Sequence, residues 1–326
     1  MRKLAVRTET WPLAKPFTIS RGTNTEAQVV VVEITDGGHV GRGESVPYPR
    51  YGETVDEVLS EIRNQAAAIE GGLERDALWY VTVPGAARNA IDAALWDLQA
   101  KTDGVPVWKL AEVPEPKPAL TAQTLSIDTP DAMGAAAAEL ASAPLLKVKL
   151  DAELVLERIR AVRAGAPDAR LIADANEAWD IDLLKSVAPE MAELGVEMIE
   201  QPLPADADDD LAGYDCPVLL CADESCHTSD DLAALQGLFG MINIKLDKTG
   251  GLTEALNLAR AAEAAGFKIM VGCMVGTSLA MAPAMMLASF AEFVDLDGPL
   301  ILKDDREPGL VFDGGSVAPP TAALWG

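Results

Sequence analysis

The chain has 326 residues, of which 49% are hydrophobic, and a net charge of −25 that comes from 51 acidic and 26 basic side chains. This length fits a barrel with a small accessory domain, and the hydrophobic fraction is enough for a large core. An acidic surface repels phosphodiester backbones and anionic lipid headgroups, so we expect neither nucleic acid nor membrane partners.

The thiols and the amino-terminal residues also limit the class of protein. The first residues lack the pattern of a secretion signal, and no run of 18 apolar residues occurs. The four cysteines show no C-x-x-C spacing and only two histidines are present, so we expect neither a zinc site nor a disulfide framework. These features predict a cytoplasmic protein.

Residues 1–115 have the pattern of a small α+β domain. Apolar runs on both sides of Asp36-Gly37-Gly38 predict an antiparallel hairpin, because such glycine pairs favour tight turns between strands. Helices are predicted over about 54–70 and 85–101, the second from apolar positions that recur with a period near 3.6.

Strands and helices alternate after this domain. The alternation over residues 116–299 predicts eight parallel βα units, and hence a (β/α) barrel. The seventh strand, near Cys273, carries little other chemistry. The last residues, 300–326, are rich in proline and glycine, and we expect them to return to the first domain.

Reactive side chains recur near the carboxyl ends of the predicted barrel strands. In chain order they are Lys147 with Lys149, Asp174, Glu200, Asp223, Lys245, and Asp295 with Asp297. Residues at these ends converge in a barrel, and active sites form there.

Three of these strand ends are acidic and consecutive. Asp174, Glu200 and Asp223 repel one another in one cleft unless a cation neutralises them. Oxygen ligands favour a hard ion, and a small site with room for substrate oxygens points to Mg²⁺.

The lysines lie on the second and sixth predicted strands, which stand opposite each other in a barrel of eight. Lys149 and Lys245 are therefore expected to face a substrate from two sides, while Lys147 points the same way as Lys149. A lysine that is desolvated near a cation has a lowered pKa and can act as a base. Two bases on opposite faces can invert a carbon, so the pattern favours racemisation or epimerisation over dehydration.

Together these motifs resemble the enolase superfamily, and within it the muconate-lactonizing subgroup. The resemblance is carried by Lys147-Val148-Lys149, Asp174-Ala175-Asn176, Glu200-Gln201-Pro202, Ala222-Asp223-Glu224-Ser225 and Asn243-Ile244-Lys245. It runs along nearly the whole chain. Asp295-Leu296-Asp297 resembles the D-x-D pair of the dipeptide epimerases in this subgroup, particularly the L-Ala-D/L-Glu epimerases.

The resemblance implies a modified TIM barrel with an α+β capping domain that the C-terminal segment completes. It implies Mg²⁺ on Asp174, Glu200 and Asp223, and acid/base roles for Lys149 and Lys245. The substrate is expected to be inverted at the α-carbon of its C-terminal residue, through an enediolate that the metal stabilises.

Further residues are expected to bind the substrate. The resemblance places Lys147 near the substrate carboxylate. Asp295 and Asp297 add two negative charges beyond the metal set, and the terminal ammonium of a dipeptide is the cation that would pair with them.

Specificity is expected from two capping loops that cover the barrel mouth, the first near residues 16–26 and the second near 47–53. Arg21 in the first loop is the candidate partner of a glutamate side-chain carboxylate, because guanidinium binds carboxylates through two nitrogens. Thr124 and Cys273, on the first and seventh strands, are also expected to contact the substrate.

Three polar residues are expected just behind these groups. Asn176 follows a metal ligand, whereas Glu224 and Asp247 are expected to orient Lys245 because they lie close to the site in sequence.

The sequence favours a dipeptide epimerase with L-Ala-L/D-Glu as substrate and a role in murein peptide metabolism; a homo-oligomer is a further expectation. Alternatives on the same scaffold are a muconate-lactonizing-type cycloisomerase, an o-succinylbenzoate synthase and an N-acylamino acid racemase. A Schiff-base aldolase with a nucleophilic lysine, or a barrel that only binds a ligand, also stays open.

Overall fold

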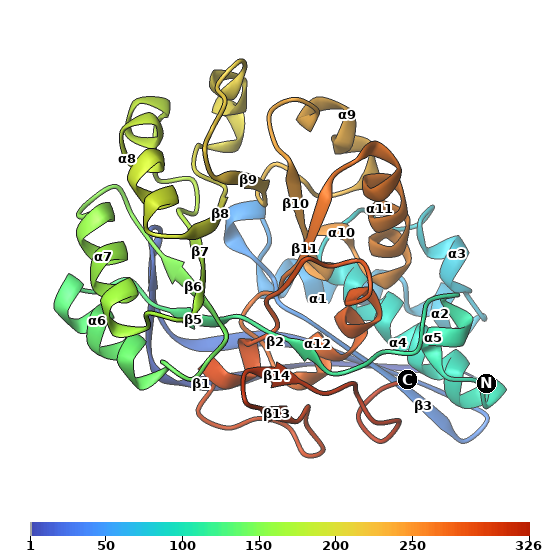
Figure 1. Ribbon diagram of the computed structural model, residues 1–326. Helices are drawn as coiled ribbons and strands as arrows, with labels where there is room; N and C mark the ends of the chain where they lie inside the picture. The colour runs from blue at the N-terminus through green and yellow to red at the C-terminus, as the bar shows by residue number, and fades with distance from the viewer. Residues whose placement is uncertain (1) are drawn as a thin grey trace.

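The computed structural model describes residues 2–326 (Figure 1). Its amino-terminal part contains an antiparallel sheet whose strands adjoin in chain order. These strands are β1 (Lys3–Ile19), β2 (Gly22–Asp36) and β3 (His39–Ser45). The predicted hairpin is confirmed, since Asp36 pairs with His39 and both intervening glycines have positive φ.

Short helices and one long helix complete this domain. They are a 3₁₀ turn η1 (Pro49–Tyr51) and the helices α1 (Val55–Asn64), α2 (Ala66–Glu70), α3 (Arg75–Leu78), α4 (Ala86–Asp103) and α5 (Val107–Leu110). The single helix expected over 54–70 is wrong in one respect, because the chain breaks it at Gln65 into α1 and α2.

The long helix α4 lies directly on β3 because β3 contains two glycines. A Cβ atom added at Gly41 would lie 2.1 Å from the Ala94 carbonyl oxygen, and one at Gly43 would lie 2.1 Å from that of Ala90. Gly41 and Gly43 therefore serve close helix packing.

The barrel strands form one parallel sheet in chain order, as predicted. They are β5 (Gln123–Leu125), β6 (Leu145–Lys149), β7 (Arg170–Asp174), β8 (Val196–Glu200), β9 (Leu219–Ala222), β10 (Met241–Ile244), β11 (Lys268–Val271) and β12 (Phe293–Val294). A parallel bridge between Thr121 and Val294, with Ala122 N–H donating to the Val294 carbonyl at 2.8 Å, joins the last strand to the first.

Helices and 3₁₀ segments follow these strands along the chain. They are α6 (Pro130–Glu139), α7 (Val155–Gly165), α8 (Ile181–Glu193), η2 (Ala205–Leu211), η3 (Ser229–Asp231), α9 (Leu232–Leu235), α10 (Leu246–Thr249), α11 (Leu252–Ala265), α12 (Ser278–Ala284), η4 (Met285–Leu287) and α13 (Gly298–Ile301). In Figure 1 the strands stand between α6, α7 and α8 on one side and α11 on the other. The connection from β8 to β9 departs from the regular pattern, since it holds only the 3₁₀ segment η2.

An apolar layer fills the inside of the barrel at its amino-terminal end. It consists of Ala122, Leu145, Ile172, Met198, Cys221, Met241, Met270 and Phe293, all buried. Side chains two positions apart on a strand face the same way, so the residue two positions after each apolar one also points into the barrel. This register places Lys147, Asp174 and Glu200 directly above the apolar layer.

The C-terminal segment packs against earlier parts of the chain. The short strand β13 (Phe312–Asp313) pairs with β14 (Ser316–Val317), which in turn pairs with β4 (Ala119–Leu120). The Trp325 indole donates to the Ala93 carbonyl on α4 at 3.0 Å. Within residues 2–326, no helix has the length and apolar character needed to cross a bilayer.

Candidate active site

A cavity of about 690 Å³ lies at the carboxyl ends of the barrel strands, next to the two capping loops. Arg21, Tyr48 and Tyr51 line it from the capping side. The barrel side contributes Thr124, Lys147, Lys149, Asn176, Asp223, Glu224, Lys245, Cys273, Asp295 and Asp297. The structure thus brings most of the predicted site residues together in one place.

Lys147 lies between three carboxylates. Its ammonium is 2.7 Å from Glu200 Oε2, 2.7 Å from Asp295 Oδ2 and 3.2 Å from Asp174 Oδ2. Burial disfavours its charge, but Asp295, Glu200 and Asp174 outweigh burial and hold the pKa of Lys147 well above its ordinary value. Lys147 is therefore a fixed positive charge.

Lys149 and Lys245 stand on opposite sides of the barrel, on β6 and at the end of β10. Lys149 Nζ donates to Asp174 Oδ2 at 2.5 Å and to Asn176 Oδ1 at 3.2 Å. Lys245 Nζ donates to Asp223 Oδ2 at 2.5 Å. Burial opposes the charge of Lys245, yet Asp223 outweighs it and the pKa of Lys245 lies well above its ordinary value. The lowered pKa predicted for this lysine requires the charge of a cation beside it.

The three central acids differ in their tendency to ionise. Burial disfavours the charge of Asp174 and Asp223, but Lys149 beside the first and Lys245 beside the second hold both pKa values well below the ordinary range. Burial and the charge of Asp174 instead raise the pKa of Glu200 to about 7.

These acids have oxygens available for a cation. Glu200 Oε2 and Asp223 Oδ1 are buried and accept no hydrogen bond of normal geometry from residues 2–326, although lysine nitrogens lie 2.7 Å away. Lysine ammonium groups occupy the space between the acids, and no trio of acidic, histidine or cysteine side chains in the described chain already surrounds an ion position. The all-oxygen donor set of Asp174, Glu200 and Asp223 fits Mg²⁺.

The two aspartates after β12 have different partners. Asp295 Oδ2 contacts Lys147, while its Oδ1 is buried with no hydrogen-bond partner in the described chain. Asp297 Oδ2 accepts the backbone N–H of Thr124 at 2.7 Å. Burial and the charge of Asp295 raise the pKa of Asp297 to about 7. Asp295 Oδ1 is therefore a free hydrogen-bond acceptor, whereas Asp297 is held by the backbone of Thr124.

The residues expected behind the site are placed less uniformly. Asn176 contacts Lys149, and its amide nitrogen lies 3.5 Å from Glu224 Oε1. Asp247 does not orient Lys245: its Oδ1 accepts the N–H of Val46 and the amide of Asn89. The prediction was wrong because Asp247, in the first turn of α10, directs its carboxylate toward Val46 and Asn89 of the capping domain.

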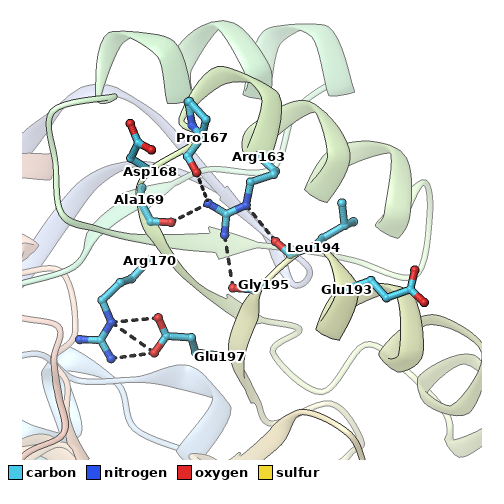
Figure 2. A pocket seen from close by; sticks show the side chains of 9 residues that line it. All are labelled: Arg163, Pro167, Asp168, Ala169, Arg170, Glu193, Leu194, Gly195 and Glu197. Atoms are coloured by element: carbon cyan, nitrogen blue, oxygen red, sulfur yellow. Dashed lines mark hydrogen bonds and ion pairs between the residues drawn. The ribbon is translucent and has the colours of Figure 1, made fainter.

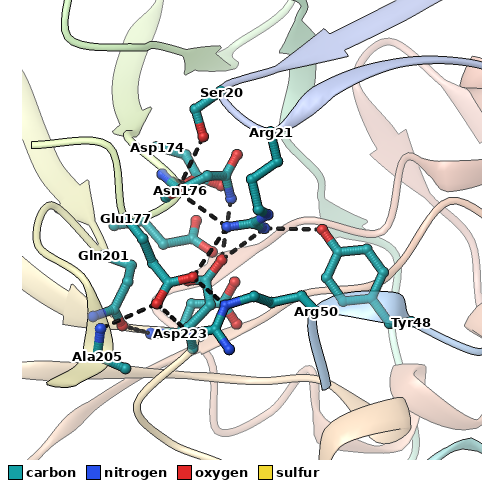
Figure 3. Close-up of polar contacts among 12 residues, drawn as sticks. Ser20, Arg21, Tyr48, Arg50, Asp174, Asn176, Glu177, Gln201, Ala205 and Asp223 are labelled. Carbon is teal, nitrogen blue, oxygen red and sulfur yellow. Dashed lines mark hydrogen bonds and ion pairs between the residues drawn. The ribbon is translucent and has the colours of Figure 1, made fainter. Parts of the chain in front are cut away.

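Arg21 reaches into the cavity but has several partners (Figure 3). One nitrogen of its guanidinium donates to the Asn176 carbonyl at 3.0 Å, and the other contacts Tyr48 Oη and Glu224 Oε1, each at 2.9 Å. The first capping loop is also shorter than expected, because β1 and β2 leave only Ser20 and Arg21 outside the strands. Any substrate carboxylate must share Arg21 with these groups.

Sequence reasoning missed Lys248. Its buried ammonium lies 2.7 Å from Asp223 Oδ1 and donates to the Asn243 carbonyl at 2.9 Å. The spacing of three residues from Lys245 was the available signal, since the short helix α10 turns Lys248 back under the site.

Cys273 lines the cavity as expected. Burial, with the charges of Asp295 and Asp297, holds the pKa of its thiol well above the ordinary value. The thiol is thus a neutral packing group toward the cavity.

Another cavity, of about 460 Å³, lies at the amino-terminal ends of β7 and β8 (Figure 2). Its Arg163 donates to backbone carbonyls, among them Leu194 at 2.8 Å and Ala169 at 2.6 Å. Arg170 pairs there with Glu197. These arginines are already satisfied by the protein, so the cavity is structural.

Comparison with known proteins identifies the family. Residues 1–111 match the N-terminal domain of the mandelate racemase / muconate lactonizing enzyme family, and residues 132–323 match the enolase C-terminal domain-like family. The chain belongs to the mandelate racemase / muconate lactonizing enzyme family of the enolase superfamily. This membership confirms the predicted family and fold class.

Two members of this family are similar to this protein over nearly the whole chain. An L-Ala-D/L-Glu epimerase from Escherichia coli K12 is 49% identical over 97% of this chain and 99% of its own. An N-acetyl-D-glutamate racemase from Pseudoalteromonas is 46% identical over 91% of this chain and 95% of its own.

Solved structures of family members show the same fold. An enolase family member from Agrobacterium tumefaciens with homology to dipeptide epimerases, containing sodium and L-Ala-L-Glu, is 52% identical, with a TM-score of 0.98 and full coverage of both chains. A dipeptide epimerase from Enterococcus faecalis V583, complexed with Mg and L-Leu-L-Tyr, is 30% identical, with a TM-score of 0.90 over 99% of this chain and 98% of its own.

Proposed function

We propose that this protein is a Mg²⁺-dependent dipeptide epimerase that inverts the α-carbon of the C-terminal residue of L-Ala-L-Glu and its D-Glu epimer. The observation that carries the proposal is the buried, unpaired Oδ1 of Asp295, in the same cavity as two lysines on opposite sides. Similarity to epimerases along nearly the whole chain supports it.

Asp174, Glu200 and Asp223 are the residues that would hold the metal, through their carboxylate oxygens. Bound there, Mg²⁺ would offset the carboxylate charge that raises the pKa of Lys245 and would stabilise negative charge that develops on the substrate. Lys147, held as a cation by its three acidic neighbours, would attract the substrate carboxylate.

The two remaining lysines account for inversion. Lys149 and Lys245 belong to β6 and the end of β10, four strands apart in a barrel of eight, so a substrate between them presents a different face to each. One lysine removes the α-proton and the other delivers a proton to the opposite face. Because both lysines are needed for one inversion, a single base does not explain this arrangement.

Asp295 and Asp297 account for the other end of the dipeptide. A terminal ammonium has three donors, and Asp295 Oδ1 is a buried acceptor with no partner within residues 2–326. Asp297, fixed by Thr124, adds charge beside it. An N-acylated amino acid has no ammonium and leaves this oxygen unsatisfied.

An N-acylamino acid racemase is the second candidate, because the Pseudoalteromonas relative has a named activity of that type. The two reactions share the lysines and the metal ligands, and they differ at Asp295. The lysines are held by carboxylates on both sides of the cavity, which argues against a Schiff-base nucleophile.

The proposal is tested by proton exchange in D₂O with Mg²⁺ present. L-Ala-L-Glu should gain deuterium at the α-carbon of glutamate and appear as its D-Glu epimer, whereas N-acetyl-L-glutamate should exchange far more slowly. Faster exchange of N-acetyl-L-glutamate would favour the second candidate, and no exchange with any dipeptide would overturn the proposal.

The biological setting is part of the same proposal. All four cysteines are free thiols, which supports a reducing compartment such as the cytoplasm. A substrate with this composition supports a role in murein peptide metabolism. The homo-oligomer stays a prediction, which light scattering on the purified protein will check.

A further inference from the structure

Glu177 lies just outside the cavity, in a turn of unusual backbone geometry after β7. Asn176 and Glu177 have φ values of 44° and 68°, in the left-handed region that residues other than glycine seldom occupy. Hydrogen bonds hold the turn: Asn176 N–H donates to Asp174 Oδ1, and Glu177 N–H donates to the Gln201 carbonyl, both at 2.9 Å. Such a conformation persists only where its surroundings enforce it, so the position of Glu177 is well defined.

The Glu177 carboxylate contacts both capping loops at once (Figure 3). From the second loop, Arg50 Nε and a terminal nitrogen donate to its two oxygens, each at 2.6 Å. From the first loop, Arg21 lies 3.3 Å from Oε2. On the barrel side, Ala205 N–H donates to Oε1 at 3.0 Å.

The first loop makes a further contact with the turn at Asn176 and Glu177. The Ser20 hydroxyl and the Arg21 guanidinium both donate to the Asn176 carbonyl at 3.0 Å. Both capping loops therefore contact the adjacent residues Asn176 and Glu177, and the first loop also reaches Glu224 through Arg21 and Ser126 through Thr18.

The contact with Glu177 is more sheltered than an ordinary surface ion pair. The Glu177 side chain is 8% exposed, compared with 26% for Arg21 and 40% for Arg50, so the arginines cover the carboxylate. Bidentate, charge-assisted hydrogen bonds of this kind are stronger than exposed pairs and fix orientation as well.

We propose that Glu177 is a positioning residue that holds both capping loops closed over the cavity through Arg21 and Arg50. It contacts no reacting group in this arrangement. Its effect on catalysis is through the orientation of Arg21, and that part of the inference rests on the proposed function.

The barrel offers a matched control for the test. Arg170 Nε and a terminal nitrogen donate to Glu197 at 2.9 and 2.7 Å, in another bidentate pair (Figure 2). This pair lies at the opposite end of the barrel, with both side chains more than a third exposed. Glu197→Gln thus removes a similar contact far from the loops.

The experiment compares Glu177→Gln with Glu197→Gln by hydrogen exchange and kinetics on the full chain with Mg²⁺. In Glu177→Gln, amide exchange in residues 16–26 and 47–53 should become about tenfold faster, in keeping with loss of a charge-assisted contact. KM for L-Ala-L-Glu should rise about tenfold while kcat changes much less, because the loops position substrate and do not transfer protons. Glu197→Gln should change neither quantity.

A second variant guards against misfolding. Arg50→Gln removes the partner from the exposed side of the pair and should reproduce the faster exchange of both loops. The double variant should add little to either single one, because all three break one contact. Unchanged loop exchange in Glu177→Gln and in Arg50→Gln would overturn the inference. If no dipeptide is epimerised, the proposed function fails, while loop exchange still decides the role of Glu177.

Discussion

At the scale of single residues, positively and negatively charged side chains alternate across the site. Lys149 is bound to Asp174, Lys147 is bound to Asp174 and Glu200, and Lys245 is bound to Asp223. Each of these ammonium groups contacts carboxylates on one side, so it can approach a substrate only from the other side. In the proposed mechanism, this confinement would make Lys149 and Lys245 act on opposite faces of the substrate.

The first prediction separates those faces. Lys149→Ala and Lys245→Ala should each lose epimerisation by about 10³-fold, within the usual range for an acid/base group. Each variant should still exchange the α-proton of one epimer of Ala-Glu in D₂O, and the two should retain opposite epimers. NMR of L-Ala-L-Glu and L-Ala-D-Glu measures this directly; retention of the same epimer by both would contradict the assignment of faces.

The second prediction concerns the free oxygen of Asp295. Asp295→Asn removes the negative charge that pairs with a terminal ammonium, so KM for L-Ala-L-Glu should rise about 30-fold, as loss of a charge-assisted hydrogen bond implies. Exchange of N-acetyl-L-glutamate should change little. Asp313→Asn, an exposed aspartate on β13, is the control. Equal losses with both substrates would show that Asp295 only supports Lys147.

At the scale of elements, one oxygen ties three of them together. Asp247 Oδ1, on α10, accepts the N–H of Val46 after β3 at 3.0 Å and the amide of Asn89 on α4 at 2.8 Å. Burial raises the pKa of Asp247 to about 7. The folded protein therefore keeps a proton that the unfolded chain loses at lower pH.

The third prediction follows from that difference. Between about pH 4 and pH 7 the folded state binds more protons at Asp247 than the unfolded state, so this residue makes stability fall as pH rises. Asp247→Asn keeps the accepting Oδ1 and removes the titration. Its free energy of unfolding should exceed that of the parent at pH 8 by up to about 4 kcal/mol, since one pKa unit corresponds to about 1.4 kcal/mol.

Urea unfolding at pH 5 and pH 8 measures this effect, with Asp313→Asn as the control. The advantage of Asp247→Asn should shrink at pH 5, because the loss of stability at Asp247 accumulates as the pH rises from about 4 to about 7 and only part of it is present at pH 5. A constant difference at the two pH values would mean that Asp247 is already ionised in the folded protein.

The elements also show how far sequence reasoning reaches. Regular alternation predicted the strands β5 to β12, because strand periodicity and connection length are local properties. It did not predict the break between α1 and α2, or the replacement of a helix by η2 before β9. Those features depend on packing between segments that are distant in sequence.

The candidate site was predictable to the same extent. Residues at the carboxyl ends of barrel strands converge by topology, so the sequence alone could predict that the reactive residues at these ends form one site. Lys248 was missed because it follows a strand end and returns through one helical turn. The contact between Arg50 and Glu177 spans 127 residues and two domains, and no local pattern encodes it.

At the scale of the whole molecule, charged side chains are not evenly distributed. Lys147, Lys149, Lys245 and Lys248 gather in one barrel that belongs to a chain with a net charge of −25. Dipeptides with a net negative charge are repelled by the surface at long range, so their association should weaken at low ionic strength.

The apolar layer from Ala122 to Phe293 consists of buried side chains that close the barrel beneath the cavity. A substrate that enters past the capping loops can leave only along the path by which it came. A long peptide that is threaded through the barrel is therefore ruled out as a mode of binding. A cavity that is closed at the bottom favours short molecules as ligands.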